Sequence, residues 1–155
     1  MSIQDFLIKL KKQGKIEIVE KSEEISNSYL EKSESNLSSA KILFNNKKLE
    51  EAIYLSYYSM YNSAVALLSK VGIKCENHSA SIFLLNRIFN IDNSPIKNAK
   101  KERIDKQYYT DFKIIEKDVL ELIKTAESFN NNLFDFISRL TNEKINLYRE
   151  KIRNI

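Results

Sequence analysis

Apolar residues recur every three or four positions along most of this chain, which is the period of an amphipathic α-helix. Two glycines and one proline among 155 residues leave few natural breaks, so long helices are expected. The pattern predicts helices at residues 3–12, 22–44, 49–71, 79–90 and 116–140, and a last one after Thr141. Together they predict an all-α, up-and-down bundle of four to five main helices.

Capping and turn residues mark the ends of these helices. Gly14 and Gly72 each follow a stretch with helical periodicity and are expected to end a helix, whereas Asn77 or Ser79 is expected to cap the next one. Residues around Pro95 have turn composition, and "KIEIV" reads as a brief extended link. We expect residues 1–21 to form a short helix and link, and residues 22–155 to form a single bundle domain. In the last helix, Lys144 or Arg149 is expected to point outward.

The helix at 49–71 carries an unusual number of hydroxyl and amide groups. Its stretch "AIYLSYYSMYNSAVALL" contains four tyrosines, serines and an asparagine among apolar residues. Positions 55, 58 and 62 align on one helical stripe and positions 54, 57 and 61 on the next. The core side is formed by Ala52, Ala64, Leu67 and Leu68. Either the polar groups pair inside the bundle, or they line a site where another molecule or subunit docks.

Net charge, cysteine content and the length of apolar runs limit the classes of protein to which the chain can belong. A net charge of +4 is mildly basic, below that of a dedicated nucleic-acid binder, although lysines cluster at 9–12 and 97–106. Those clusters fit a solvated helix face as well as a binding surface. Cys75 is the only cysteine, which excludes an internal disulfide. The chain shows neither a secretory signal nor an apolar run of about 20 residues, so we expect a cytoplasmic protein without a membrane anchor.

Ordinary catalytic motifs are missing. One histidine and one cysteine leave only carboxylates for a metal site, and the sequence contains no glycine-rich phosphate loop or nucleophile turn. We therefore expect no metal and no cofactor. His78 fits a structural hydrogen bond in a capping loop better than catalysis, and Cys75 lacks a plausible base other than His78.

The stretch "YLEKSESNLSSAKILFNNKKLEEAIYLSYYSMYNSAVALLSKVGIKCENHSASIFLL" resembles the HEPN domain. It is similar in particular to the small stand-alone prokaryotic HEPN proteins associated with minimal nucleotidyltransferases (MNT). The matching features are the "YLEKSESNLSSAKIL" helix, the "YYSMYN" motif, the "GI…H" loop and the later segment "ERIDKQYYTDF".

This resemblance implies an all-α bundle that pairs about a two-fold axis. In active members, an Arg-x(4–6)-His motif forms a metal-independent ribonuclease site across the dimer, in which the guanidinium holds the phosphate and the imidazole moves protons. In toxin–antitoxin pairs the MNT partner silences the HEPN protein, in some cases by adding AMP to a tyrosine.

The present sequence departs from that motif. The family's histidine falls on Asn62 and its arginine on Leu55, and the other allowed arginine positions hold Tyr57 and Ser56. The positions at the same spacing before His78 hold isoleucine, glycine and valine. Since asparagine cannot shuttle a proton and leucine cannot hold a phosphate, we expect no ribonuclease activity by the family mechanism. The usual tyrosine for AMP addition is Ala64 here, which leaves the nearby Tyr58 and Tyr61 as candidates.

Our leading hypothesis is a HEPN-type homodimer that acts as a binding module. The tyrosine-rich helix would form the dimer face, an MNT nucleotidyltransferase would be the partner in a toxin–antitoxin-like or defence pair, and Tyr54, Tyr58, Tyr61 and Asn62 would surround the former catalytic cleft. One alternative is an active ribonuclease toxin that uses His78 or Arg87 from the dimer. The other is a non-catalytic protein that binds RNA or a nucleotide in a polar groove, formed by Tyr58, Asn62, Arg87, Arg103 and Lys106.

Overall fold

The computed structural model describes residues 1–108 and 113–155, so the end of the "ERIDKQYYTDF" segment lies outside the described residues. The helices are α1 (Ile3–Lys12), α2 (Glu23–Asn45), α3 (Leu49–Val71), α4 (His78–Arg87), α5 (Ser94–Tyr108), α6 (Glu116–Ser138) and α7 (Asn142–Arg153). Two short strands, β1 (Ile16–Ile18) and β2 (Ile73–Cys75), join them. The predicted all-α bundle is confirmed. Among the described helices, none has the length and apolar character needed to cross a bilayer.

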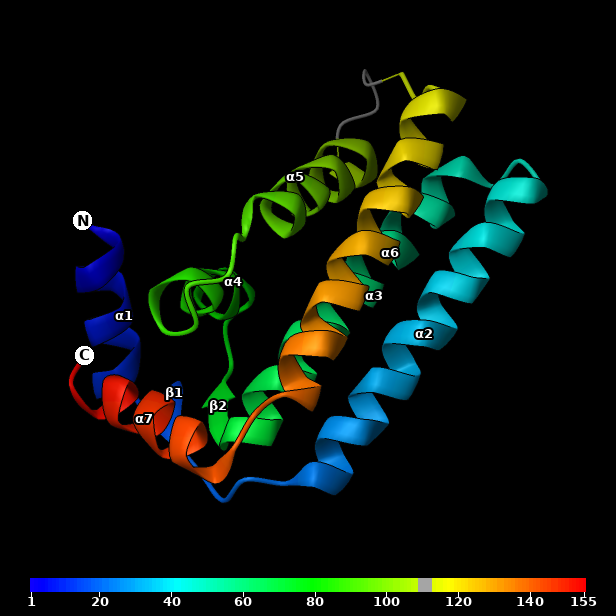
Figure 1. Ribbon diagram of the computed structural model, residues 1–155. Helices are drawn as coiled ribbons and strands as arrows, with labels where there is room; N and C mark the ends of the chain where they lie inside the picture. Colours follow the sequence, from blue (N-terminus) through cyan, green and yellow to red (C-terminus); the bar gives the residue numbers. More distant parts are fainter. Residues whose placement is uncertain (109–112) are drawn as a thin grey trace.

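Helix α3 is the centre of the bundle. The long helices α2, α3 and α6 lie side by side, and α5 packs along α3 (Figure 1). Most of α3 is buried, including its predicted core side at Ala52, Ala64, Leu67 and Leu68. At one end of the bundle, α1, α4 and α7 gather around the two strands, and the two termini lie close together (Figure 1).

Helix ends follow the predicted caps. The side chain of Asn77 accepts a hydrogen bond from the Ala80 amide at 2.9 Å, and the hydroxyl of Thr141 accepts one from the Lys144 amide at 3.2 Å. Gly72 ends α3 in the left-handed conformation, with φ of 84°. Asn77 starts α4 at residue 78, and the helix ends at Arg87, three residues before the predicted end.

The strand pair ties the N-terminal segment to the bundle. β1 runs antiparallel to β2, with Ile16 opposite Cys75 and Ile18 opposite Ile73. The sequence predicted an extended link at β1 but a loop at β2, because strands of three residues leave no periodic pattern. Leu7 and Ile16 bury their side chains in the main core. The division of the chain at residues 21 and 22 stays a prediction.

Helix α5 was not expected from the sequence. The turn chemistry predicted around Pro95 is the start of this helix: Asp92 accepts hydrogen bonds from the amide and hydroxyl of Ser94, and proline fits the first helical turn. Between residues 94 and 106 of this helix, only Ile96 and Ala99 are buried. The rest of the helix is strongly charged, so its apolar stripe is too thin to be recognised from the sequence.

Arg149 does not point outward, which corrects one of the two options offered for α7. Its Nη1 donates to the carbonyl oxygens of Val19 at 2.7 Å, Val71 at 2.9 Å and Gly72 at 3.2 Å. Carbonyls at the C-terminal end of a helix have no partner within the helix, and they attract a cation. The guanidinium therefore ties α7 to the end of α3, whereas Lys144 is exposed.

Candidate functional site

On the inner side of α3, the polar residues pair with one another inside the bundle. The Ser33 hydroxyl donates to the Ser59 carbonyl and the Ser59 hydroxyl to the Ser33 carbonyl, both at 2.7 Å. Asn130 of α6 donates to the Ser59 hydroxyl at 2.7 Å and accepts from Ser63 at 3.0 Å. These buried groups satisfy one another, so they join α2, α3 and α6 and leave nothing for a ligand.

The opposite side of α3 carries a cluster of aromatic and cationic groups built around Tyr57. This tyrosine is fully buried, and its hydroxyl lies 3.1 Å from Nδ1 of His78. The guanidinium of Arg103, from α5, lies 5.1 Å from the Tyr57 ring centre and 5.5 Å from that of Tyr58. Arg103 also donates to the Tyr58 hydroxyl at 2.9 Å. Side chains of α4 and α5 therefore meet the tyrosines of α3 at this point.

His78 covers Tyr61 with one ring face. The two ring centres are 3.9 Å apart and the planes are nearly parallel, at 14°. Burial lowers the pKa of the imidazole, and the nearby charges of Lys100 and Arg103 lower it further. Burial raises the pKa of the Tyr57 hydroxyl, so this group stays protonated at neutral pH. The cluster thus combines a neutral imidazole, a neutral phenol and a permanent cation.

In chemical terms, the cluster offers one firm capability and one weak one. Arg103 is held by two aromatic rings and a phenol oxygen, and it brings a permanent positive charge to the cluster. Burial lowers the pKa of His78, and its Nδ1 lies within hydrogen-bond distance of the buried Tyr57 hydroxyl. Anion binding is therefore better supported here than acid–base catalysis.

The structure brings together only some of the predicted groove residues. Arg103 and Tyr58 are in direct contact, but Lys106 faces another way and donates to the Lys113 carbonyl at 3.2 Å. Arg87 is exposed in the last turn of α4, and within residues 1–108 and 113–155 it makes no side-chain hydrogen bond or ion pair. The hydroxyl of Tyr54 is directed at Glu50, one turn away on the same helix.

Asn62 and Leu55, at the two motif positions, lie where α3 meets the surface. Asn62 is 8% exposed, and in the described part of the chain its amide has no hydrogen-bond partner. Leu55 is half-buried. Of the two candidates for AMP addition, Tyr58 accepts from Arg103, and the Tyr61 hydroxyl lies 3.4 Å from the Ser81 hydroxyl.

A continuous aromatic and apolar surface runs along this side of α3. We call it the tyrosine face and define it by the half-buried residues 54, 55, 58, 61 and 65 of α3, Asn62 between them, and Ile25 and Tyr29 of α2. Ile25 is 51% exposed. Burial raises the pKa of Tyr61, and Tyr29 lies close enough to add to this shift. His78 of α4 and Arg103 of α5 reach part of this surface, at Tyr61 and Tyr58, whereas its tyrosines, Leu55 and Val65 remain partly exposed.

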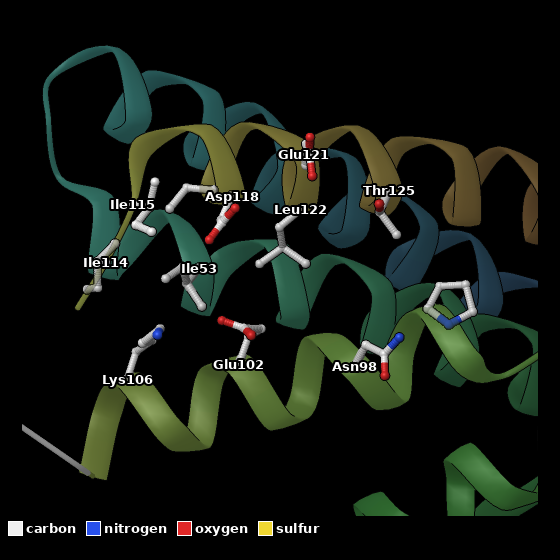
Figure 2. Close-up of a pocket in the computed structure, with 12 residues that line it drawn as sticks. Ile53, Asn98, Glu102, Lys106, Ile114, Ile115, Asp118, Glu121, Leu122 and Thr125 are labelled. Atoms are coloured by element: carbon white, nitrogen blue, oxygen red, sulfur yellow. The ribbon is translucent and has the colours of Figure 1, made fainter. Parts of the chain in front are cut away.

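A separate pocket of about 250 Å³ lies between α5 and α6, behind the tyrosine face. Figure 2 shows Glu102 and Lys106 of α5 facing Asp118 of α6 across it, with Ile53 of α3 between them. Its charges are mixed and its floor is apolar. Among the described residues, acidic, histidine and cysteine side chains do not gather in a group that could hold a metal ion.

Sequence reasoning missed members of both the Tyr57 cluster and the buried network on the inner side of α3. Tyr57 was assigned to a stripe but not to the site, although its place in "YYSMYN" was a usable signal. Lys100, which donates to Ser79, was hidden in a lysine run that fits a solvated face equally well. Asn130 gave no signal, because its partners lie on α3, 71 and 67 positions earlier in the chain.

Comparison with known proteins shows which family the chain is similar to. The model of the HEPN domain matches residues 26–136, a span that contains α3 to α5 and nearly all of α2 and α6. A candidate toxin from Methanocaldococcus jannaschii is 33% identical over 107 residues, which cover 64% of this chain and 79% of that protein.

Proposed function

This chain belongs to the HEPN domain family, and we propose that it works as a dimeric binding module in a toxin–antitoxin-like or defence pair. Two copies pair through the tyrosine face, and the complex binds a second protein, an MNT-type nucleotidyltransferase. The similarity to a candidate toxin supports this class of function.

One observation carries the proposal, namely the partly exposed aromatic surface along α3. Its tyrosines have rings that bury readily and hydroxyls at the margin, which is the composition of the centre of a protein interface. Asn62 stands in this surface with an amide that the described residues leave unpaired, as expected of a group that meets its partner in a second subunit.

The motif positions are the reason to expect binding without cleavage. At the point where α3 meets the surface, Leu55 and Asn62 offer neither a guanidinium nor an imidazole. A dimer built on this face keeps the shape of the family's cleft without its two reactive groups.

Paired substitutions on α2 test the dimer face. Ile25→Asp places a charge on the tyrosine face, and Ile42→Asp places the same charge on an exposed isoleucine a little over a quarter turn round the same helix. We expect Ile25→Asp to elute as a monomer and Ile42→Asp to remain a dimer, by gel filtration with light scattering. Two variants with the mass of the wild type would place the interface elsewhere.

Co-expression with the neighbouring reading frame tests the partner. If that frame encodes a small nucleotidyltransferase, the two proteins should purify together through a tag on either one. Absence of a nucleotidyltransferase gene, or its complete separation during purification, would contradict the partner assignment while leaving the dimer intact.

A second candidate function is RNA or nucleotide binding, favoured by the convergence of Arg103, Tyr58 and His78. Arg103→Gln should weaken binding of single-stranded RNA about tenfold if the guanidinium holds a phosphate. The alternative of an active ribonuclease predicts cleavage that disappears in His78→Gln. We expect no cleavage in either the wild type or the variant.

A further inference from the structure

A second pocket, of about 290 Å³, lies between α4 and α5. It is separate from the tyrosine face and from the α5–α6 pocket of Figure 2. Its α5 wall carries Lys97, Lys100 and Lys101, which share one helical face. The other wall is α4, with Ser79, Ile82 and Phe83.

The cationic half of this pocket lacks a matching negative charge. Among the described ion pairs, none involves these three lysines, and Asp105 is the one carboxylate that lines the pocket. Lys100 donates to the Ser79 hydroxyl, and partial burial together with Arg103 lowers its pKa. Ser79 lies in the first turn of α4, where the backbone amides add partial positive charge. An anion placed here would relieve this repulsion.

The other half is apolar and firmly built. Ile82 is buried, and Phe83 packs edge-on against Phe6 with ring centres 6.2 Å apart. Ile104 closes the floor from α5. A pocket with an apolar floor and a rim of ammonium groups is suited to a ligand that has both an apolar body and an anionic head.

We propose that the α4–α5 pocket binds an organic phosphate, with the phosphate at the lysine ammoniums and the planar or apolar body against Ile82, Phe83 and Ile104. Phosphate fits better than a carboxylate because it has more acceptor oxygens and a higher charge, matching several donors. The proposal does not depend on dimer formation, since the pocket is lined entirely by α4 and α5 of one chain.

Titration calorimetry with phenyl phosphate, inorganic phosphate and phenol separates the two halves. Phenyl phosphate should bind at least tenfold more tightly than either fragment, because only it uses both the charges and the apolar floor. Equal affinity for phenyl phosphate and inorganic phosphate would overturn the proposal, as would the absence of saturable binding.

Matched lysine variants locate the site. Lys97→Gln combined with Lys101→Gln should weaken phenyl phosphate binding about tenfold or more, because two charge-assisted contacts are lost. Lys117→Gln, an exposed lysine at the start of α6, should leave the affinity unchanged. A similar loss in both proteins would show general charge attraction and overturn the site.

The phosphate could be carried by a free small molecule or by the end of a nucleic-acid strand. A short oligonucleotide with a 5′-phosphate should bind more tightly than phenyl phosphate, in a manner sensitive to the same two lysines, if the strand end is the source. If the two bind equally well, the pocket takes a small molecule. Lysine-independent binding of either ligand counts against the assignment.

Discussion

The two sides of α3 use the same residue types for opposite purposes. On the inner side, the serines at 33, 59 and 63 and Asn130 are buried and bonded to one another. On the tyrosine face, the tyrosines are half-buried, and the largely buried Asn62 has no partner among the described residues. A polar residue on a core helix is therefore not in itself evidence of a site; evidence comes from whether its partners lie within the same chain.

The largest expected effect is on the inner side. Asn130→Ala removes both amide contacts, leaves Ser59 and Ser63 without them and opens a cavity, so it should lower the free energy of unfolding by about 2–4 kcal/mol. Asn131→Ala, at the exposed neighbouring position, should cost less than about 0.5 kcal/mol. Urea unfolding of both variants checks this. Similar stabilities would mean that the buried network does not hold the three helices together.

A smaller effect is expected in the tyrosine cluster. Tyr57→Phe removes a buried hydroxyl that contacts His78, and it should lower the free energy of unfolding by about 1 kcal/mol. Tyr54→Phe removes a hydroxyl directed at the partly exposed Glu50 and should cost about half as much or less. If the Tyr54 variant is the less stable of the two, the Tyr57 hydroxyl contributes less to the free energy of unfolding than the Tyr54 hydroxyl, which would contradict this prediction.

The smallest effect is a dependence on pH. The folded pKa of His78 lies below its ordinary value of 6.5, so the unfolded chain binds the proton more readily. The contribution of His78 to stability is complete above pH 6.5, and it falls as the pH drops from 6.5 towards the folded pKa. Because the chain has one histidine, its imidazole proton resonances can be followed by NMR without overlap. A midpoint at or above 6.5 would contradict the burial against Tyr61.

Much of the fold could be predicted because local residue patterns determine where most of its helices begin and end. The apolar period placed α1, α2, α3 and α6 to within two residues at either end, and the start of α7 was predicted correctly after Thr141. Asn77, Gly72 and Thr141 marked ends through their own chemistry. Helix α5 and strand β2 were not predicted, because packing against distant elements stabilises them and their own residue pattern does not mark them.

The site was less predictable for the same reason. Helical spacing grouped the tyrosines correctly by stripe, but it could not show that Tyr57 is wholly buried while Tyr58 reaches Arg103. Arg103 and Tyr58 are 45 positions apart, and their contact depends on how α5 crosses α3. No local pattern encodes that crossing, so Arg87 and Arg103 looked equally suitable from the sequence although only Arg103 reaches the cluster.

We expect a second copy of the chain to cover the tyrosine face. Sedimentation equilibrium of the unmodified protein at micromolar concentrations tests it most directly. We predict a molar mass twice that of the 18.1 kDa chain, with Ile25→Asp reducing it to the monomer value. A mass of 18.1 kDa at every concentration would contradict the claim and leave the aromatic surface of α3 without its proposed partner.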